Sequence, residues 1–236
     1  MQIQTLAESI SPKNRPYVQP AVRAVHEKSP RNSGTSGGTL EMMGAAMSFA
    51  RNGEIYGEGE AADYIYKVVS GTVRSYKLLD DGRRQINAFH LPGDVFGLEA
   101  ARNHHFSAEA VTRATVLVVK RSALVALAAR QNDVANELWT LTARELQKVQ
   151  NLMITLGRKN ALGRVAAFLL EMAGRGFDKH ILELPMSRQD IADYLGLTIE
   201  TVSRTFTQLE NNSAIELPTS RRVVLRDRGA LNRLNA

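Results

Sequence analysis

The sequence contains no cysteine. Disulfide bonds, cysteine-ligated iron–sulfur clusters, cysteine-type zinc sites and thiol nucleophiles are therefore excluded. No early segment joins basic residues to a long apolar run, so no signal peptide is evident. No run of about 18 apolar residues predicts a transmembrane helix. These absences favour a cytoplasmic protein that has no membrane partner.

The composition is that of an ordinary globular protein. Of the 236 residues, 44% are hydrophobic and 23% are charged. A chain of this length can form two modest hydrophobic cores. The formal net charge is +6. A basic excess of this size is compatible with a polyanionic partner, but it does not by itself identify one.

Four segments of the chain differ in composition and periodicity. Residues 1–38 are rich in proline, glycine and serine and predict a flexible leader, with room for one short helix around residues 19–27. Residues 39–130 hold short valine-, isoleucine- and aromatic-rich runs separated by turn signals such as Asp80–Gly82, and they predict a β-roll or barrel. Residues 131–157 predict a long helix, and a hinge at 157–161 leads into a small C-terminal domain at 158–236.

The predicted long helix carries apolar residues at spacings of three and four. This seam contains Trp139, Thr142, Leu146, Val149, Met153 and Leu156. A seam of about three heptads predicts parallel pairing with the same helix of a second copy. The alternative is that the stripe packs only on its own β domain. Leu138, Leu141 and Leu152 lie off the seam and are available for that contact.

The stretch SRQDIADYLGLTIETVSRTFTQLE, Ser187 to Glu210, predicts two helices joined by a tight turn. Ser187 and Asp190 have the spacing of a capping box, Gly196 suits a left-handed turn, and Thr198 is placed to cap the second helix. The shared core is expected from Ile191, Leu195, Val202, Phe206 and Leu209. In a helix-turn-helix the second helix enters the major groove of DNA.

The outer face of the second helix has a composition suited to base edges. Arg204 is predicted to bind guanine O6 and N7, and Glu200 to accept a hydrogen bond from cytosine N4. Ser203 offers a hydroxyl, and Ile199 offers an apolar contact for a thymine methyl. The alternative is a surface ion pair between Glu200 and Arg204, four residues apart; both can hold, because the pair could orient Arg204 towards its guanine.

Basic residues outside this helix are candidates for the DNA backbone. The run AIELPTSRRVVLRD predicts a two-stranded hairpin, and its Arg221 and Arg222 are expected to contact phosphates as a wing. Arg188, at the start of the first helix, is also placed for phosphate. A solvated charge run is the alternative for any single arginine here.

These motifs resemble the CRP/FNR family of bacterial transcription regulators over roughly residues 40–227. The likeness rests on GEIYGEGEAADYIYKVVSGTVRSYKLLDDGRRQINAFHLPGDVFG and, more specifically, on MSRQDIADYLGLTIETVSRTFTQLE. It implies an α+β fold, with an N-terminal β-roll like that of cyclic-nucleotide-binding sensors, a dimerisation helix and a winged helix-turn-helix. The pattern of Glu200, Ser203 and Arg204 is similar to the FNR and FixK branch, whose targets resemble TTGAT-N4-ATCAA.

The resemblance also implies further contacts. Backbone contacts are expected from Ser187, Arg188, Thr198 and Thr201. Regulation through RNA polymerase is expected as well, with the loop at residues 173–180 as a candidate contact. The protein is expected to bind double-stranded DNA as a homodimer and to activate transcription.

The β-roll departs from the cyclic-AMP-binding members of the family. Leu98 stands where those members carry a ribose-binding glutamate, with Glu99 one position away, and Phe106–Ser107 replaces their phosphate-binding Arg-Ser pair. Without that arginine, a buried phosphate would lack its charge partner. The cysteines that bind a cluster in FNR-type sensors are also missing. We therefore expect no cofactor and activity without a ligand, as in FixK-type regulators.

A ligand-gated interpretation is kept open. The β-roll could hold a small ligand or haem, which would make the protein a ligand-gated switch or a repressor. His104 and His105 are the candidates for haem, although adjacent loop histidines are more often solvated. An enzyme is not indicated, because no base–nucleophile spacing or phosphate-binding loop is evident.

Overall fold

A computed structural model of the chain describes residues 39–176 and 178–235. The predicted leader at residues 1–38 lies outside the described residues. Among those described, no helix is both long and apolar enough to cross a membrane.

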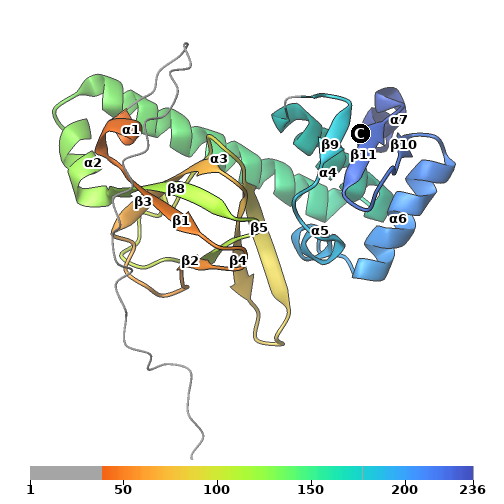
Figure 1. The fold of residues 1–236 in the computed structure, drawn as a ribbon, viewed down its shortest axis with the longest axis horizontal. Coiled ribbons are helices and arrows are strands. Elements are labelled where there is room, and N and C mark those ends of the chain that lie inside the picture. The colour runs from red at the N-terminus through yellow and green to blue at the C-terminus, as the bar shows by residue number, and fades with distance from the viewer. Residues whose placement is uncertain (1–38, 177, 236) are drawn as a thin grey trace, which may run out of the picture. The chain divides into compact units, whose positions relative to one another are not determined.

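After α1, Thr39–Met43, the chain forms a β-roll of two four-stranded antiparallel sheets (Figure 1). One sheet has the strand order β1-β8-β3-β6, and the other has the order β2-β7-β4-β5. The strands are β1 Ala45–Phe49, β2 Glu54–Tyr56, β3 Tyr64–Ser70, β4 Val73–Leu78, β5 Arg84–His90, β6 Val95–Phe96, β7 Ser107–Ala110 and β8 Ala114–Lys120. The predicted β-roll is thereby confirmed.

Glycines set two of the turns that close the roll. Gly82, with φ of 80°, completes the predicted turn between β4 and β5. Gly71, with φ of 79°, joins β3 to β4, and a Cβ there would lie only 2.2 Å from the carbonyl oxygen of Arg113. The turn at Gly71 therefore needs glycine both for its backbone conformation and for the close approach of the neighbouring chain.

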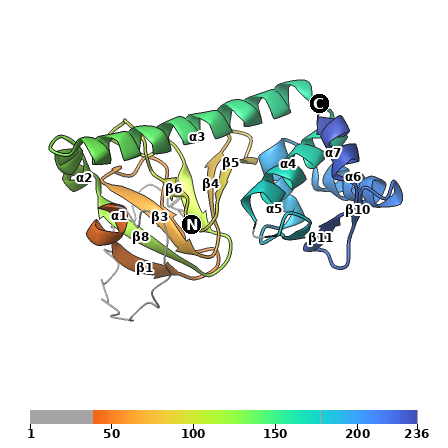
Figure 2. The same ribbon diagram turned by 90° about the horizontal axis from the view of Figure 1, so that it is seen from above.

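Two helices follow the roll: α2, Arg121–Ala128, and the long α3, Asn132–Arg158. Figure 2 shows α3 running along the β-roll from α2 toward the C-terminal domain. Leu138 and Leu141 pack on a core cluster of the roll, and Leu152 packs on the C-terminal core. Leu138 and Leu141 thus make the contact with the β domain that was open to the off-seam leucines, whereas Leu152 serves the C-terminal core instead.

The hinge is shorter than predicted. Gly157 remains inside α3, and α4, Ala161–Arg175, begins after Asn160, whose side-chain oxygen accepts a hydrogen bond from the Gly163 amide at 2.9 Å. A glycine costs a helix only about 1 kcal/mol, which continuing hydrogen bonds can offset. The interruption between α3 and α4 thus lies inside the predicted hinge at 157–161 and is confined to residues 159–160. The predicted loop at residues 173–180 is also shorter, because α4 extends to Arg175.

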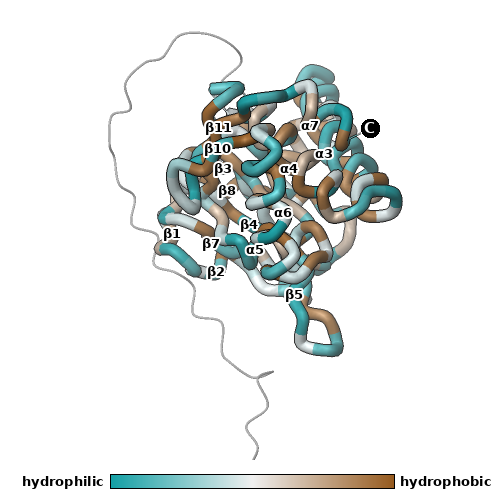
Figure 3. Tube along the Cα trace, turned by 90° about the vertical axis from the view of Figure 1, so that its right-hand side faces the viewer, coloured by the Kyte–Doolittle hydropathy of each residue, from teal (hydrophilic) through white to brown (hydrophobic). Residues whose placement is uncertain are grey.

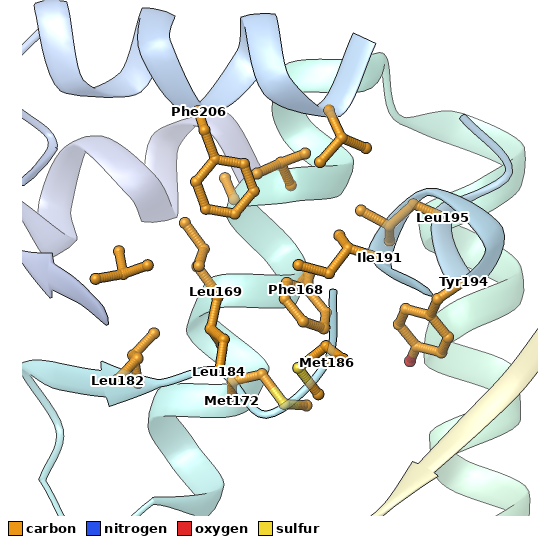
Figure 4. Close-up of a cluster of buried hydrophobic side chains, with 14 of the residues drawn as sticks. Phe168, Leu169, Met172, Leu182, Leu184, Met186, Ile191, Tyr194, Leu195 and Phe206 are labelled. Atoms are coloured by element: carbon orange, nitrogen blue, oxygen red, sulfur yellow. The ribbon is translucent and has the colours of Figure 1, made fainter. Parts of the chain in front are cut away.

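The C-terminal domain packs its helices around one apolar interior. After α4 come β9 Ile181–Glu183, α5 Arg188–Leu195, α6 Ile199–Asn211, β10 Ile215–Glu216, β11 Arg222–Leu225 and α7 Arg228–Asn235. Figure 4 shows Phe206 of α6, Ile191 and Leu195 of α5, and Phe168 and Leu169 of α4 turned toward this common interior. The two helices of the predicted helix-turn-helix are α5 and α6.

The wing differs from the prediction in one respect. The expected hairpin is present as β10 and β11, but β11 also pairs with β9, so the sheet order is β10-β11-β9. The β9 register places Val223 opposite Leu182, and both side chains are buried. β9 has only three residues, and no tight turn joins it to β11. No local sequence pattern therefore predicts their pairing, which is why a two-stranded hairpin was predicted.

Candidate nucleic-acid interface

The first helix of the motif, α5, begins with the predicted capping box. The Ser187 hydroxyl oxygen accepts a hydrogen bond from the Asp190 amide at 3.1 Å, and Asp190 Oδ2 accepts one from the Ser187 amide at 3.0 Å. At the other end, Gly196 adopts the left-handed conformation with φ of 60° and ψ of 42°. The tight turn into α6 is therefore built by the residues that predicted it.

The second helix, α6, is fixed by a cap and by one buried stripe. Thr198 Oγ1 accepts a hydrogen bond from the Thr201 amide at 3.2 Å. The stripe consists of Val202, Phe206 and Leu209, all buried. Figure 3 shows hydrophilic and hydrophobic residues alternating along α6. One side of the helix therefore serves the core, and the opposite side is available to a ligand.

Four predicted base-contacting residues, Ile199, Glu200, Ser203 and Arg204, lie exposed on the outer side of α6. Among the described residues, no hydrogen bond or ion pair holds the Arg204 guanidinium, so the predicted alternative, a surface pair with Glu200, is not formed. The Ser203 hydroxyl donates to the Ile199 carbonyl oxygen at 2.8 Å, which leaves its lone pairs as acceptors. Its own backbone N–H, the Thr198 hydroxyl and the charge of Arg204 hold the pKa of the Glu200 carboxyl below the ordinary value.

The exposed face continues beyond Arg204 as an open hollow of about 480 Å³. Its lining consists of Ser203, Arg204, Thr207, Gln208, Asn211 and Asn212. Hydroxyl and amide side chains can donate or accept hydrogen bonds, and the single formal charge is positive. A surface of this kind suits base edges and a phosphate backbone better than it suits an apolar ligand.

Arg188 lies differently from the other predicted phosphate contacts. Its guanidinium carbon is 3.2 Å from the centroid of the Phe206 ring, and its Nη1 is buried and has no hydrogen-bond partner among the residues described. Burial lowers the pKa of Arg188 to about 10, so the group stays charged near neutrality. A contact between Arg188 and phosphate stays a prediction.

The other predicted phosphate contacts lie at the edges of the motif. Ser187 and Thr201 are partly exposed, and Thr198 is exposed. On the wing, Thr219 Oγ1 accepts hydrogen bonds from the amides of Arg221 and Arg222 and orders the turn. Arg222 lies 3.4 Å from Glu183, whereas the Arg221 side chain has no ion-pair partner among the described residues. The positive charge of Arg221 is therefore available to a phosphate.

Arg164 was not singled out from the sequence, yet it joins the motif to α3. Its guanidinium donates to the carbonyl oxygens of Leu156 at 2.7 Å and Leu195 at 2.9 Å, and its Nε donates to that of Lys159 at 3.0 Å. The C-terminal carbonyls of α3 and α5 are therefore satisfied by one cation. An arginine inside an ordinary helical pattern gives no sequence signal for this role.

The predicted dimer seam forms an exposed apolar stripe on α3. Trp139, Leu146, Val149 and Met153 are exposed, as is Thr142, whereas Leu156 is partly buried. A stripe of large apolar side chains is unusual on a monomeric surface. The seam therefore lies on a different side of α3 from the leucines that serve the subunit's own core.

The interior of the β-roll departs from one prediction. His104 is only 2% exposed and stacks on Tyr56, with ring centroids 3.6 Å apart and an interplanar angle of 11°. Its Nδ1 lies 3.1 Å from Glu99 Oε2, so Glu99 is engaged inside the protein. The expectation that both histidines are solvated was wrong for His104, because aromatic stacking and the carboxylate hold the ring inside. His105 is exposed.

Leu98 and Ser107, which stand at the ligand-binding positions of the cyclic-AMP-binding members, also make contacts within the protein. Leu98 packs on the core cluster that includes Ile65 and Leu124. Ser107 accepts a hydrogen bond from the Glu58 amide at 2.9 Å. Within the described ranges, no group of three or more histidine and acidic side chains could hold a metal ion.

Comparison with known proteins agrees with this architecture. Residues 163–234 match the model of the Crp-like helix-turn-helix domain, and residues 46–131 match that of the cyclic nucleotide-binding domain. The chain is 53% identical over 199 residues to the nitrogen fixation regulation protein FixK of Azorhizobium caulinodans, covering 82% of this chain and 80% of the relative.

Two further matches extend this comparison. The transcriptional activatory protein AadR of Rhodopseudomonas palustris is 40% identical over 181 residues, covering 75% of each chain. The solved structure of FixK2 from Bradyrhizobium japonicum superposes with a TM-score of 0.79 at 52% identity, covering 82% of this chain and 98% of that one.

Proposed function

The chain belongs to the CRP/FNR family of transcription regulators, and from this membership we propose a specific mode of action. The protein acts as a homodimeric activator that binds a palindrome resembling TTGAT-N4-ATCAA, without cyclic nucleotide or iron–sulfur cluster. In this proposal residues 39–130 form the β-roll, 131–157 the dimerisation helix and 158–236 the DNA-binding domain.

The observation that carries the proposal is the exposed face of α6. The Arg204 guanidinium carries five N–H donors and has no hydrogen-bond or ion-pair partner within residues 39–176 and 178–235, which is the arrangement needed for a bidentate contact with guanine. Glu200 is an ionised acceptor one helical turn earlier, where it can select cytosine N4. A carboxylate near phosphates is unfavourable unless it is paired with a base donor, so this acid favours sequence reading over general DNA affinity.

Two-fold pairing is supported by the exposed seam of α3. Trp139, Leu146, Val149 and Met153 would be removed from water by the same residues of a second copy. Two-fold symmetry would then place the two copies of α6 about 34 Å apart, one turn of DNA. This geometry explains why a palindrome is the proposed target.

Independence from a ligand is supported by the interior of the β-roll. The acidic group nearest the ribose position, Glu99, is paired with His104, and no arginine precedes Ser107. Activation is supported by the relative named an activatory protein, and it would require a contact with RNA polymerase. The segment at residues 173–180 is the proposed polymerase contact; of it, Phe177 lies outside the described residues.

Fluorescence anisotropy with a labelled TTGAT-N4-ATCAA duplex tests the DNA claim. We expect tight binding to this duplex and weaker binding to a scrambled one at physiological salt. Arg204→Ala should reduce the preference for its guanine by about 1–3 kcal/mol. Arg51→Ala, which removes the same charge from an exposed turn of the β-roll, is the matched control. Equal affinity for both duplexes would contradict sequence-specific binding.

Analytical ultracentrifugation tests the dimer. Val149 on the seam is 55% exposed, and Val125 on α2 is 56% exposed, so the two valines form a matched pair. Val149→Glu should give monomers, because it would place two carboxylates in an apolar contact, whereas Val125→Glu should leave the dimer intact. Unchanged sedimentation of Val149→Glu would contradict the proposed seam.

Calorimetric titration with cyclic AMP and with haem tests ligand independence. We expect no saturable heat with either compound and no change in DNA affinity in their presence. Saturable heat coupled to a change in DNA affinity would instead support the ligand-gated alternative, since a ligand can shift an equilibrium only by binding one state better.

A further inference from the structure

We infer that Arg84 and Arg74 of the β-roll are positioning residues for DNA binding, because they hold the helix-turn-helix in place through the acids of α5. This inference rests on the proposed DNA-binding function. The four side chains Arg74, Arg84, Asp190 and Asp193 are called the α5 clamp below.

The α5 clamp joins parts of the chain that are more than a hundred residues apart. Arg74 Nη1 and Arg84 Nη2 lie 2.9 Å and 2.7 Å from the same oxygen, Asp190 Oδ1. Arg84 Nε also donates to Asp193 Oδ2 at 2.8 Å. Asp190 and Asp193 lie three residues apart, so both face β4 and β5 from one side of α5.

Asp190 has two separate tasks. Its Oδ2 closes the capping box with Ser187, and its Oδ1 accepts from the two arginines. Burial alone would raise the pKa of Asp190, but the hydrogen bonds from Ser187 and the charges of both arginines outweigh burial and lower it. The carboxylate that forms the first turn of α5 is therefore also the carboxylate by which the β-roll holds that helix.

The clamp is shielded from water, which makes its geometry specific. The side chains of Arg74 and Asp190 are only 9% and 7% exposed. Phe89 of β5 packs beside the clamp on Tyr194 of α5, with ring centroids 5.3 Å apart. Arg74 also pairs with Glu109 of β7 at 2.9 Å, so separating the clamp would leave mainly the buried Asp190 without its charge partners. Sliding of α5 along β5 would break these bonds.

The clamp leaves the DNA-reading surface free. It uses the first two turns of α5, whereas Glu200 and Arg204 of α6 remain exposed. The docked arrangement therefore does not block DNA. Instead it restricts the motion of the DNA-binding domain before DNA binds, so the entropy lost on binding is smaller. Loosening the clamp should weaken binding to all duplexes while leaving the base preference unchanged.

Arg84 and Asp193 offer a test that separates positioning from simple electrostatics. Arg84→Gln removes a positive charge, and Asp193→Asn removes a negative one. If only the overall field mattered, the first change would weaken DNA binding and the second would strengthen it. If the clamp matters, both changes weaken it. The asparagine keeps an oxygen for Gln189, which donates to Asp193 Oδ1 at 2.6 Å.

Arg83→Gln is the matched control. Arg83 directly precedes Arg84, but its side chain is 79% exposed and pairs with Asp81 in its own turn, whereas the Arg84 side chain is 22% exposed. Equilibrium anisotropy at one salt concentration compares wild type, Arg84→Gln, Asp193→Asn, the double variant and Arg83→Gln. Each clamp variant should bind about tenfold more weakly, and the double variant should be no weaker than either single one.

Hydrogen exchange without DNA provides a second measurement. The amides of α5 should exchange faster in Arg84→Gln and in Asp193→Asn than in wild type or Arg83→Gln. Clamp variants with wild-type affinity, opposite effects of the two charge changes, or additive losses in the double variant would each overturn the inference. Lack of specific DNA binding by wild type would instead refute the proposed function, and the exchange data would still decide whether the clamp holds α5.

Discussion

Acid is expected to destabilise the protein through His90, the last residue of β5. This histidine is 4% exposed and stacks on Phe96, with ring centroids 4.7 Å apart. Its Nε2 lies 2.9 Å from Ser75 Oγ, and its Nδ1 is buried with no hydrogen-bond partner in the part of the chain that the structure describes. A proton on this ring would therefore create an unsolvated cation, and burial lowers the pKa of His90 from 6.5 to about 4.

The sign and size of the effect follow from this pKa. Between pH 6.5 and about pH 4 the unfolded chain binds a proton at this histidine and the folded chain does not. Stability from the neutral ring is therefore fully present above pH 6.5 and is lost as the pH falls toward 4. At about 1.4 kcal/mol per pKa unit, the loss amounts to about 3 kcal/mol.

Urea unfolding at a series of pH values measures this loss. His90→Gln, which keeps a side-chain amide for Ser75, should remove most of the slope of unfolding free energy against pH in this window. His105→Gln, which changes an exposed histidine, should leave the slope intact. An equal slope in wild type and His90→Gln would refute the reasoning.

Three other variants test the local geometry by thermal or chemical unfolding. Thr198→Ala should cost about 1 kcal/mol through loss of the α6 cap, and Thr207→Ala in the same helix should cost less. Gly71→Ala should be more destabilising than Gly59→Ala, because both have positive φ but only Gly71 faces a neighbouring carbonyl; equal costs would rule out the close approach as the cause. Arg164→Gln should cost about 2 kcal/mol through unsatisfied carbonyls, and Arg164→Lys should not restore it, since one ammonium cannot span three carbonyls.

The sequence predicted what depends on neighbours along the chain. The capping box at Ser187, the left-handed Gly196 and the Thr198 cap are all set by contacts within four residues, and each is confirmed. The β-roll could be predicted for the same reason, since its turns carry their own glycines. The base-contacting residues on α6 follow from the same helical period, and their contacts with DNA stay a prediction.

Features that depend on distant residues could not be predicted. Asp190 fits the capping-box pattern completely, so nothing local suggested two arginines from β4 and β5 as further partners. His104 looked like a loop residue because Tyr56, which covers its ring, lies far away in sequence. The contact of the Arg188 guanidinium with the Phe206 ring could not be predicted either, because Phe206 belongs to the other helix of the motif.

The separation of the two apolar sides of α3 has a practical consequence for operator choice. Because the residues proposed to pair subunits differ from those that hold a subunit together, the seam can be recoded without rebuilding the fold. Oppositely charged seams in two versions of the chain would favour mixed pairs over like pairs. If one member also carried a changed α6, such a pair would bind a non-palindromic operator, with each half-site assigned to a chosen subunit.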